Sequence, residues 1–173
     1  MCGCRQTEDG LQPALQLRQQ IETSEKVSFT CGITADDGEN LYSFSAVCHF
    51  DRTGKMEFSV IKPDSIAGIT GIIDQEEGNL TFDGQALAFP LLADGYISPI
   101  SAPWVFMNAL RSGYIASYRH TEDGLLITLD DSYGLSQLQV DVWTDENTNP
   151  IRSEMLWKGR RILSLEVEDF SCV

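Results

Sequence analysis

Over most of this chain, apolar side chains recur at every second position. In the first such run Val27, Phe29 and Cys31 alternate with small polar residues, and runs around Phe44 and Phe58 repeat the pattern. Because successive side chains of a β-strand point to opposite faces, a period of two predicts strands with one buried and one solvated face. Short turns rich in Asp and Gly separate the runs, so consecutive strands are expected to pair antiparallel.

The alternation predicts a mainly β domain of about ten or eleven strands. The runs cover residues 27–34, 42–50, 55–60, 66–73, 79–82, 85–89, 114–119, 125–129, 135–143, 151–157 and 161–170. An antiparallel sheet of this size twists, and the twist curls it toward a barrel or part of a barrel with an apolar inner face. We therefore expect an unclosed antiparallel β-barrel.

Two segments depart from the period of two and are predicted to be helices. Residues 13–25 place Leu17 and Ile21 on one modest apolar stripe. A second helix is expected after Ser101, whose side chain can cap it, and before Gly113, which stops it. This inserted helix is apolar on nearly every side and must be covered on more than one side, so the concave face of the sheet is its natural place.

The charge of the chain excludes one class of partner. With 26 acidic against 12 basic residues, the formal net charge is −14. Such a surface repels phosphate backbones, and the basic residues form no stripe, so nucleic-acid binding is not expected. The sequence also has no run of about 18 apolar residues, the length that a membrane-spanning helix needs.

The first residues, Met-Cys-Gly-Cys, are similar to the end of a bacterial lipoprotein signal peptide. In such peptides a small residue precedes the cysteine that receives the lipid, which fits Cys4 after Gly3, or Cys2 if the initial methionine is not native. On this interpretation residues 1–12 are a lipid-bearing tether, and residues 13–173 form a single domain anchored outside the cytoplasmic membrane. The alternative is an unmodified N-terminus that happens to contain two cysteines.

The other three cysteines match no zinc-binding spacing. Cys31 and Cys48 lie on either side of a turn at residues 36–40 and are expected to face each other across a hairpin. A disulfide and two buried thiols are both compatible with that placement. Cys172 near the C-terminus is predicted either to be buried or to form an intermolecular disulfide.

The order of these elements resembles the LolA/LolB lipoprotein-carrier superfamily. The segments that carry the resemblance are F-S-V-I-K-P-D-S-I-A-G at residues 58–68, L-T-F-D-G at 80–84, and the closing strands over 145–170. The resemblance covers roughly residues 15–170 and is strongest to LolA-like lipoproteins of Gram-positive bacteria, including clostridial lipoproteins linked to spore germination. It implies an unclosed β-barrel with helices lying over it as a lid, and an apolar cavity that takes acyl chains.

No catalytic constellation emerges from the sequence. Only two histidines are present, and both His49 and His120 are expected to face solvent. Carboxylates cluster in predicted turns, where solvation explains them, and none has the spacing of a known calcium loop. We therefore expect neither an enzyme nor a bound cofactor or metal.

Large apolar side chains are the remaining candidates for a site, because ligand pockets are concave and apolar. The candidate ligand-binding residues are Phe58, Phe82, Trp104, Phe106, Met107, Trp143 and Trp157. Plain core packing is the alternative for each of them. Trp104, Phe106 and Met107 are favoured, because they lie on the inserted helix, and a lid must open for a ligand to enter.

Two functions are predicted from these features. The first is a cell-envelope lipoprotein that binds a hydrophobic ligand, either an acyl chain or a lipoprotein, in the half-barrel. The alternative is a structural or protein-interaction lipoprotein of the envelope or spore, whose core is filled and binds no ligand but whose surface contacts an envelope protein.

Overall fold

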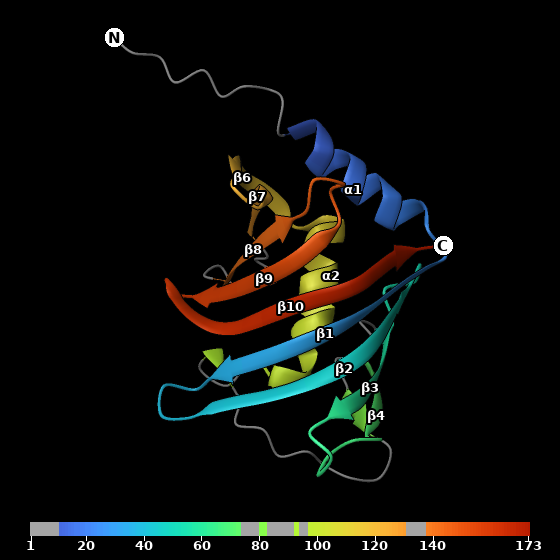
Figure 1. Cartoon of the computed structure of the whole chain (residues 1–173), viewed down its shortest axis with the longest axis vertical. Helices are drawn as coiled ribbons and strands as arrows, with labels where there is room; N and C mark the ends of the chain where they lie inside the picture. Colours follow the sequence, from blue (N-terminus) through green and yellow to red (C-terminus); the bar gives the residue numbers. More distant parts are fainter. Residues whose placement is uncertain (1–10, 74–79, 83–91, 94–96, 131–137) are drawn as a thin grey trace.

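The computed structural model describes residues 11–73, 80–82, 92–93, 97–130 and 138–173. Within these residues ten strands form one antiparallel sheet, in the order β5-β4-β3-β2-β1-β10-β9-β8-β7-β6 (Figure 1). The strands are β1 (Lys26–Asp36), β2 (Leu41–Asp51), β3 (Met56–Lys62), β4 (Thr70–Ile73), β5 (Leu80–Phe82), β6 (Tyr114–Thr121), β7 (Gly124–Asp130), β8 (Leu138–Thr144), β9 (Pro150–Trp157) and β10 (Arg160–Cys172). The predicted strand over 85–89 lies outside the described residues, as do Cys2 and Cys4.

The sheet curves without closing. Its order begins at β5 and ends at β6, and no pairing joins these two strands in the described part of the chain. The predicted unclosed antiparallel barrel of about ten strands is therefore confirmed. The first strand, β1, pairs antiparallel with the last strand, β10, so that Cys31 lies opposite Val167 and Ile33 lies opposite Leu165. Two meanders of neighbouring strands are thus joined through the first and the last strand.

The helices lie close to where the sequence predicts them. Helix α1 (Leu11–Thr23) lies at one end of the sheet, beside the C-terminus (Figure 1). Its buried residues are Ala14, Leu17 and Ile21, which form the expected apolar stripe. A short 3₁₀ turn, η3 (Pro99–Ser101), leads directly into α2 (Ala102–Ser112), and Gly113 follows its last residue.

Ser101 does not cap α2 through its side chain, contrary to the prediction. Its hydroxyl donates instead to the carbonyl oxygen of Ser98 at 2.7 Å. The backbone of Ser101 is already helical, with φ −82° and ψ −6°, because η3 continues into α2 without a break. Pro103 also removes one of the N–H groups that a capping side chain would accept from.

The predicted strand over 66–73 is shorter than expected. Residues 63–67 form a turn after β3, and the N–H of Gly68 donates back to the carbonyl oxygen of Val60 at 2.8 Å. Gly68 adopts φ +88°, a left-handed conformation that ends an extended run and that glycine adopts at little cost. Strand β4 therefore begins only at Thr70.

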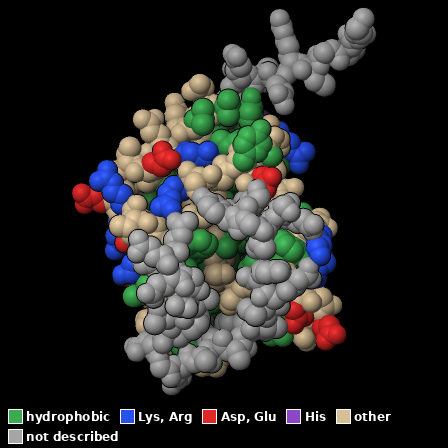
Figure 2. All heavy atoms as spheres, turned by 180° about the vertical axis from the view of Figure 1, so that it is seen from behind, with side chains coloured by type: hydrophobic (Ala, Val, Ile, Leu, Met, Phe, Trp, Pro, Cys, Tyr) green, Lys and Arg blue, Asp and Glu red, His purple; other side chains and the backbone are tan. Residues whose placement is uncertain are grey.

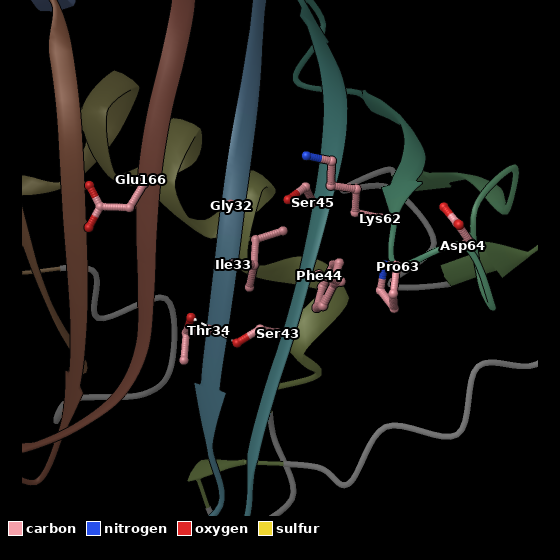
Figure 3. Close-up of a pocket in the computed structure, with 10 residues that line it drawn as sticks. All are labelled: Gly32, Ile33, Thr34, Ser43, Phe44, Ser45, Lys62, Pro63, Asp64 and Glu166. Carbon is pink, nitrogen blue, oxygen red and sulfur yellow. Dashed lines mark hydrogen bonds between the residues drawn. The ribbon is translucent and has the colours of Figure 1, made fainter.

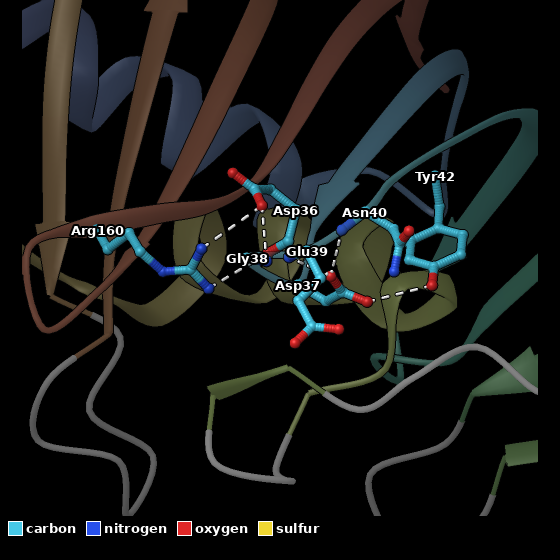
Figure 4. Close-up of polar contacts among 7 residues, drawn as sticks. All are labelled: Asp36, Asp37, Gly38, Glu39, Asn40, Tyr42 and Arg160. Carbon is cyan, nitrogen blue, oxygen red and sulfur yellow. Dashed lines mark hydrogen bonds and ion pairs between the residues drawn. The ribbon is translucent and has the colours of Figure 1, made fainter.

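The turn between β1 and β2 is held by its own carboxylates (Figure 4). Asp37 accepts hydrogen bonds from the backbone N–H groups of Asn40 and Glu39 at 2.7 and 2.8 Å. These bonds lower the pKa of Asp37. Arg160, at the start of β10, lies 3.5 Å from the carboxylate of Asp36 and so links this turn to the neighbouring hairpin. The acidic cluster here stabilises a turn, as its position in the sequence indicated.

Cys31 and Cys48 are two buried thiols, with their sulfur atoms 3.8 Å apart. They are diagonal neighbours, because Cys31 lies opposite Ala46 and Cys48 lies opposite Phe29. The hydrogen bond with Cys31 and the burial of the site both raise the pKa of Cys48, which favours its thiol form. Of the two alternatives predicted from the sequence, a disulfide or two buried thiols, the structure has two buried thiols. Cys172 is a half-buried thiol.

Candidate functional site

Helix α2 lies in the hollow of the curved sheet (Figure 1). It contacts β2, β7 and β10 on the sheet side and α1 at its flank. Its buried residues are Ala102, Pro103, Val105, Phe106, Met107, Asn108, Ala109 and Leu110. The expectation that this apolar helix is covered on more than one side is confirmed. Seen from the side that carries α2, hydrophobic side chains reach the surface near the middle of the face (Figure 2).

Phe106 and Met107 belong to the core of the molecule. Both side chains are 0% exposed. The ring of Phe106 meets Phe29 of β1 edge-on, with the ring centroids 5.7 Å apart. Phe29 in turn contacts Phe170 of β10 at 6.1 Å. Two of the three favoured ligand-binding residues, Phe106 and Met107, are therefore inaccessible in this arrangement, and a ligand would reach them only if α2 moved.

Trp104 ties the first half of α2 to the turn between β2 and β3. Its indole N–H donates to the carbonyl oxygen of Gly54 at 3.0 Å, and the ring is half-buried. Gly54 has φ +93°, and a Cβ atom there would lie 2.7 Å from the guanidinium of Arg111. That guanidinium lies over the ring of Phe50, 5.2 Å from its centroid. The turn thus fits closely against one flank of the helix.

Arg18 of α1 holds the other end of α2. Its Nε donates to the carbonyl oxygen of Leu110 at 2.9 Å, and a terminal nitrogen donates to that of Gly113 at 2.6 Å. The last carbonyls of a helix have no partner within the helix, and a cation is favourable at that end. Burial lowers the pKa of Arg18 and the nearby Glu22 opposes this shift, but a guanidinium stays charged at any ordinary pH.

Replacing Arg18 by methionine keeps the apolar part of the side chain and removes both hydrogen bonds. We expect the free energy of unfolding to fall by about 1–3 kcal/mol, because two helix carbonyls lose a charged donor at a partly buried site. Urea denaturation measures this loss. Gln19→Met, on the exposed face of the same helix, is the matched control. Equal stabilities of the two variants would contradict the role given to Arg18.

The hollow also contains polar groups without a partner. The Nδ2 of Asn108 and the hydroxyl of Ser153 are buried and have no hydrogen-bond partner among the described residues. Both residues are 0% exposed. Asn108 lies on α2. Ser153 lies on β9, two residues before the buried Met155 and on the same face of the sheet. Buried polar groups of this kind are rare, because leaving one unpaired costs about 1–3 kcal/mol.

The structure gathers most of the other candidate residues into the same core. Phe58 of β3 is buried, and a Cβ atom on Gly71 of β4 would lie 2.4 Å from its ring. Trp104 and Trp157 are partly buried and pack against the core cluster. The backbone of Phe82 lies in β5, but its side chain is outside the described part of the structure.

Trp143 lies on the opposite face of the sheet, away from α2. Leu138, Val140 and Val142 of β8 are buried, so the next residue points outward. There Trp143 stacks with Arg152 of β9, whose guanidinium carbon is 4.5 Å from the ring centroid. The structure therefore does not bring Trp143 together with the other candidates.

Beside Trp143, Glu154 accepts hydrogen bonds from two arginines. Arg152 is one donor, and Arg161 of β10 is the other, at 3.0 Å. Burial alone would raise the pKa of Glu154, but the two guanidinium groups outweigh it and hold the pKa below the ordinary value of 4.5. The carboxylate is 15% exposed and the arginines are more exposed, so water weakens these contacts.

The depressed pKa of Glu154 makes stability depend on pH in one direction. The contribution of ionised Glu154 to the free energy of unfolding is fully present above its unfolded-state pKa, near 4.5. It is lost as the pH falls through the lower folded-state pKa. We expect Glu154→Gln to reduce the free energy of unfolding by about 1 kcal/mol at neutral pH and by much less at strongly acidic pH. Urea denaturation at both pH values tests this, with the exposed Glu168→Gln as control. A difference that does not change with pH would contradict it.

The histidines take no part in the hollow. His49 faces the outer side of β2, half-buried, where its Nδ1 lies 2.9 Å from the hydroxyl of Ser28. His120 is exposed on β6, as expected. In the described ranges, no three His, Cys, Asp or Glu side chains gather closely enough to hold a metal ion. Nor does any described helix have the length and apolar character needed to cross a membrane.

No protein-family model and no curated protein matches the sequence. Solved structures similar to this chain include those of a LolA superfamily protein and of a putative outer membrane lipoprotein-sorting protein domain. The LolA superfamily protein from Nitrosomonas europaea is 8% identical, with a TM-score of 0.41 over 92% of this chain and 93% of that one. A putative outer membrane lipoprotein-sorting protein domain from Vibrio parahaemolyticus is 10% identical, with a TM-score of 0.43 over 95% and 92%.

LprF from Mycobacterium bovis is also similar, at 10% identity and a TM-score of 0.45 over 95% of this chain and 93% of that one. These identities and TM-scores are low.

Proposed function

We propose that this protein is a cell-envelope lipoprotein that binds a hydrophobic ligand, an acyl chain or the acylated end of a lipoprotein, in the hollow that α2 occupies. The observation that carries the proposal is a nearly all-apolar helix lying in the concave face of an unclosed sheet. Side-chain hydrogen bonds hold it at both ends, from Trp104 to Gly54 and from Arg18 to Leu110 and Gly113. Release of these hydrogen bonds would let α2 leave the hollow as a unit.

The energies of this exchange are close to balanced. Moving α2 outward returns large side chains such as Phe106 and Met107 to a more polar setting, at about 1.5–3 kcal/mol each. Each CH₂ group of an acyl chain that enters contributes about 0.8 kcal/mol. About ten buried methylene groups therefore offset the exposure of three large side chains, which a common fatty acyl chain supplies.

An unpaired polar group in the hollow supports an acyl ester over a plain hydrocarbon. The hydroxyl of Ser153 on β9 is buried and has no partner among the described residues, and an ester or amide carbonyl of a ligand would accept from it. Ser153 belongs to the sheet and stays in the hollow, whereas Asn108 leaves with α2. A polar group that gains its hydrogen bond only with ligand present adds to the affinity.

The N-terminal cysteines complete the proposal. Residues 1–12 act as the tether, with the lipid on Cys4 or Cys2, and residues 13–173 are the domain that the tether holds at the outer side of the membrane. Helix α1 already includes the last two residues of this segment, because it begins at Leu11, so few residues separate the lipid-bearing cysteine from the domain and the domain stays near the bilayer. A fixed receptor or chaperone suits this arrangement better than a diffusing carrier. Detergent-phase partitioning of the full-length protein from cells, with Cys2→Ser and Cys4→Ser, identifies the lipid-bearing residue.

Ligand binding is tested by titrating the protein with palmitoyl lysophosphatidylcholine and following tryptophan fluorescence. We expect a saturable change that is lost in Trp104→Phe and kept in Trp143→Phe, because Trp104 lies on the moving helix and Trp143 lies on the other face of the sheet. The same ligand should raise the melting temperature, since it binds the folded state alone. A fluorescence change that depends on Trp143 would place the ligand elsewhere, and no saturable change would end the proposal.

The alternative, a protein-interaction lipoprotein with a filled core, is favoured by two observations. Met107 of α2 and Leu165 of β10 are each 0% exposed, so the described interior is well packed. The edge strand β6 is largely exposed, with Tyr114 at 72%, and an exposed strand edge can pair with another chain. Crosslinking in cells that captures a partner on β6, without stabilisation by any lipid, would support this function instead.

A further inference from the structure

A second hollow lies on the outer face of the sheet, on the side away from α2 (Figure 3). Its volume is about 540 Å³. Side chains that line it and point outward from the sheet are those of Thr34, Ser43, Ser45, Lys62 and Glu166, and Gly32 lies at its floor. We call this hollow the outer trough.

The register of the sheet explains the shape of the outer trough. Gly32 of β1 lies opposite Glu166 of β10 on one side and opposite Ser45 of β2 on the other. Ser45 in turn lies opposite Lys62 of β3. These four residues form one row across four strands, and neighbouring strands are about 4.8 Å apart. Glu166 and Ser45 therefore flank a gap in the row where Gly32 has no side chain, and Lys62 lies one strand beyond Ser45.

The packing of the protein does not require glycine at position 32. A Cβ atom built there would have Ser45 Oγ as its nearest neighbour, at 3.9 Å, which is ordinary contact. Gly32 is also absent from the residues with positive φ. Glycine inside a strand costs about 0.5–1 kcal/mol relative to alanine, and it often marks a place where a ligand approaches the backbone closely. Here the missing side chain has one visible effect, which is to keep the trough open.

We propose that the outer trough is a binding site for an amino sugar, as part of a glycan. The hydroxyls of Thr34, Ser43 and Ser45 both donate and accept, which matches sugar hydroxyls. The carboxylates of Glu166 and Asp64 accept from an amine, and Lys62 donates to a ring or hydroxyl oxygen. Two carboxylates against one ammonium group, in a chain of net charge −14, favour a cationic over an anionic sugar.

The volume of the outer trough lies in the range of about 300–1,000 Å³ that small-molecule sites occupy. Thr34 and Ser43 are already joined by a hydrogen bond of 3.2 Å between their hydroxyls, so their positions are fixed before a ligand arrives. This site is separate from the hollow of α2, because the sheet lies between them. A protein that bound no lipid in the hollow of α2 could still bind a sugar in the outer trough. A protein that bound no sugar could still bind lipid.

The test is a titration of ¹⁵N-labelled protein with a glucosamine disaccharide, followed by amide chemical shifts. We expect shifts at Gly32, Thr34, Ser43 and Ser45, and at least a tenfold loss of affinity in Gly32→Val, whose side chain fills the trough. The melting temperature of Gly32→Val should equal or exceed that of the parent. Thr30→Val is the matched control, since Thr30 lies on the same strand and face but outside the trough, and it should bind normally.

Three results would overturn the proposal. The first is the absence of shifts at these amides at tens of millimolar disaccharide, or equal shifts in Gly32→Val. The second is binding of the zwitterionic dipeptide alanyl-alanine in place of the disaccharide, which would make the site one for peptides. The third is a clear loss of stability in Gly32→Val, which would show that the glycine serves the fold.

Discussion

Phe106→Ala is expected to lower the free energy of unfolding by about 3–5 kcal/mol, the largest effect of any single truncation in α2. The side chain is 0% exposed and lies at the contact between the helix and the central strands. Its ring meets Phe29 edge-on at 5.7 Å, a geometry that adds to the energy of burial. Truncation leaves a cavity between α2 and β1 that the stiff sheet cannot fill by collapsing.

The control for Phe106→Ala is Leu15→Ala in α1, where the side chain is 41% exposed. This change should cost less than about 1 kcal/mol, because the leucine is only partly removed from water. Urea denaturation of both variants gives the comparison. If Phe106→Ala lowered the free energy of unfolding by less than about 1 kcal/mol, the contact of α2 with the sheet would not stabilise the fold. The packing described for the hollow would then be wrong.

The second large effect is expected at the hairpin between β6 and β7, where Gly124→Ala should destabilise the fold by about 3 kcal/mol. Gly124 has φ +133°, which L-residues rarely adopt. A Cβ atom there would lie 2.0 Å from the carbonyl oxygen of Thr144, so the backbone of the neighbouring strand would have to move. Strain and collision act together at this position, and neither is relieved by a side-chain rotation.

Gly159→Ala separates the two causes. Gly159 also has positive φ, at +77°, but nothing lies within 4 Å of its Cβ position. This variant should lose only about 1 kcal/mol, from backbone strain alone. Thermal unfolding of both variants is the measurement. If Gly124→Ala were no worse than Gly159→Ala, the close approach of Gly124 to β8 would not exist in the protein.

Much of the fold was predictable because apolar and polar side chains alternate along most of the strands. The alternation around residues 27–34 and 42–50 placed strands within a few residues of β1 and β2. The predicted strand over 66–73 was too long, because the turn after Pro63 and a strand with few large side chains have similar hydropathy. The pairing of β1 with β10 was not predictable from local pattern, since its partners are more than 100 residues apart in the sequence.

The candidate site was predicted in part. Phe106 and Met107 were correctly placed on an inserted helix against the sheet. The outward position of Trp143 could have been read from the sequence, because it is out of step with Val140 and Val142. Arg18 was missed, although it stands four residues after Ala14, on the apolar stripe, which is an unusual place for a charge. What it binds, however, depends on tertiary contact that no local pattern reveals.

In the proposed function, an acyl ligand takes the place of α2 in the hollow of the sheet. Hydrogen exchange of the backbone amides, with and without saturating palmitoyl lysophosphatidylcholine, tests it directly. We expect amides of residues 104–112 to exchange at least tenfold faster with the ligand, while those of β1 and β10 stay protected. Unchanged protection of α2 in a sample that demonstrably binds the ligand would contradict the claim.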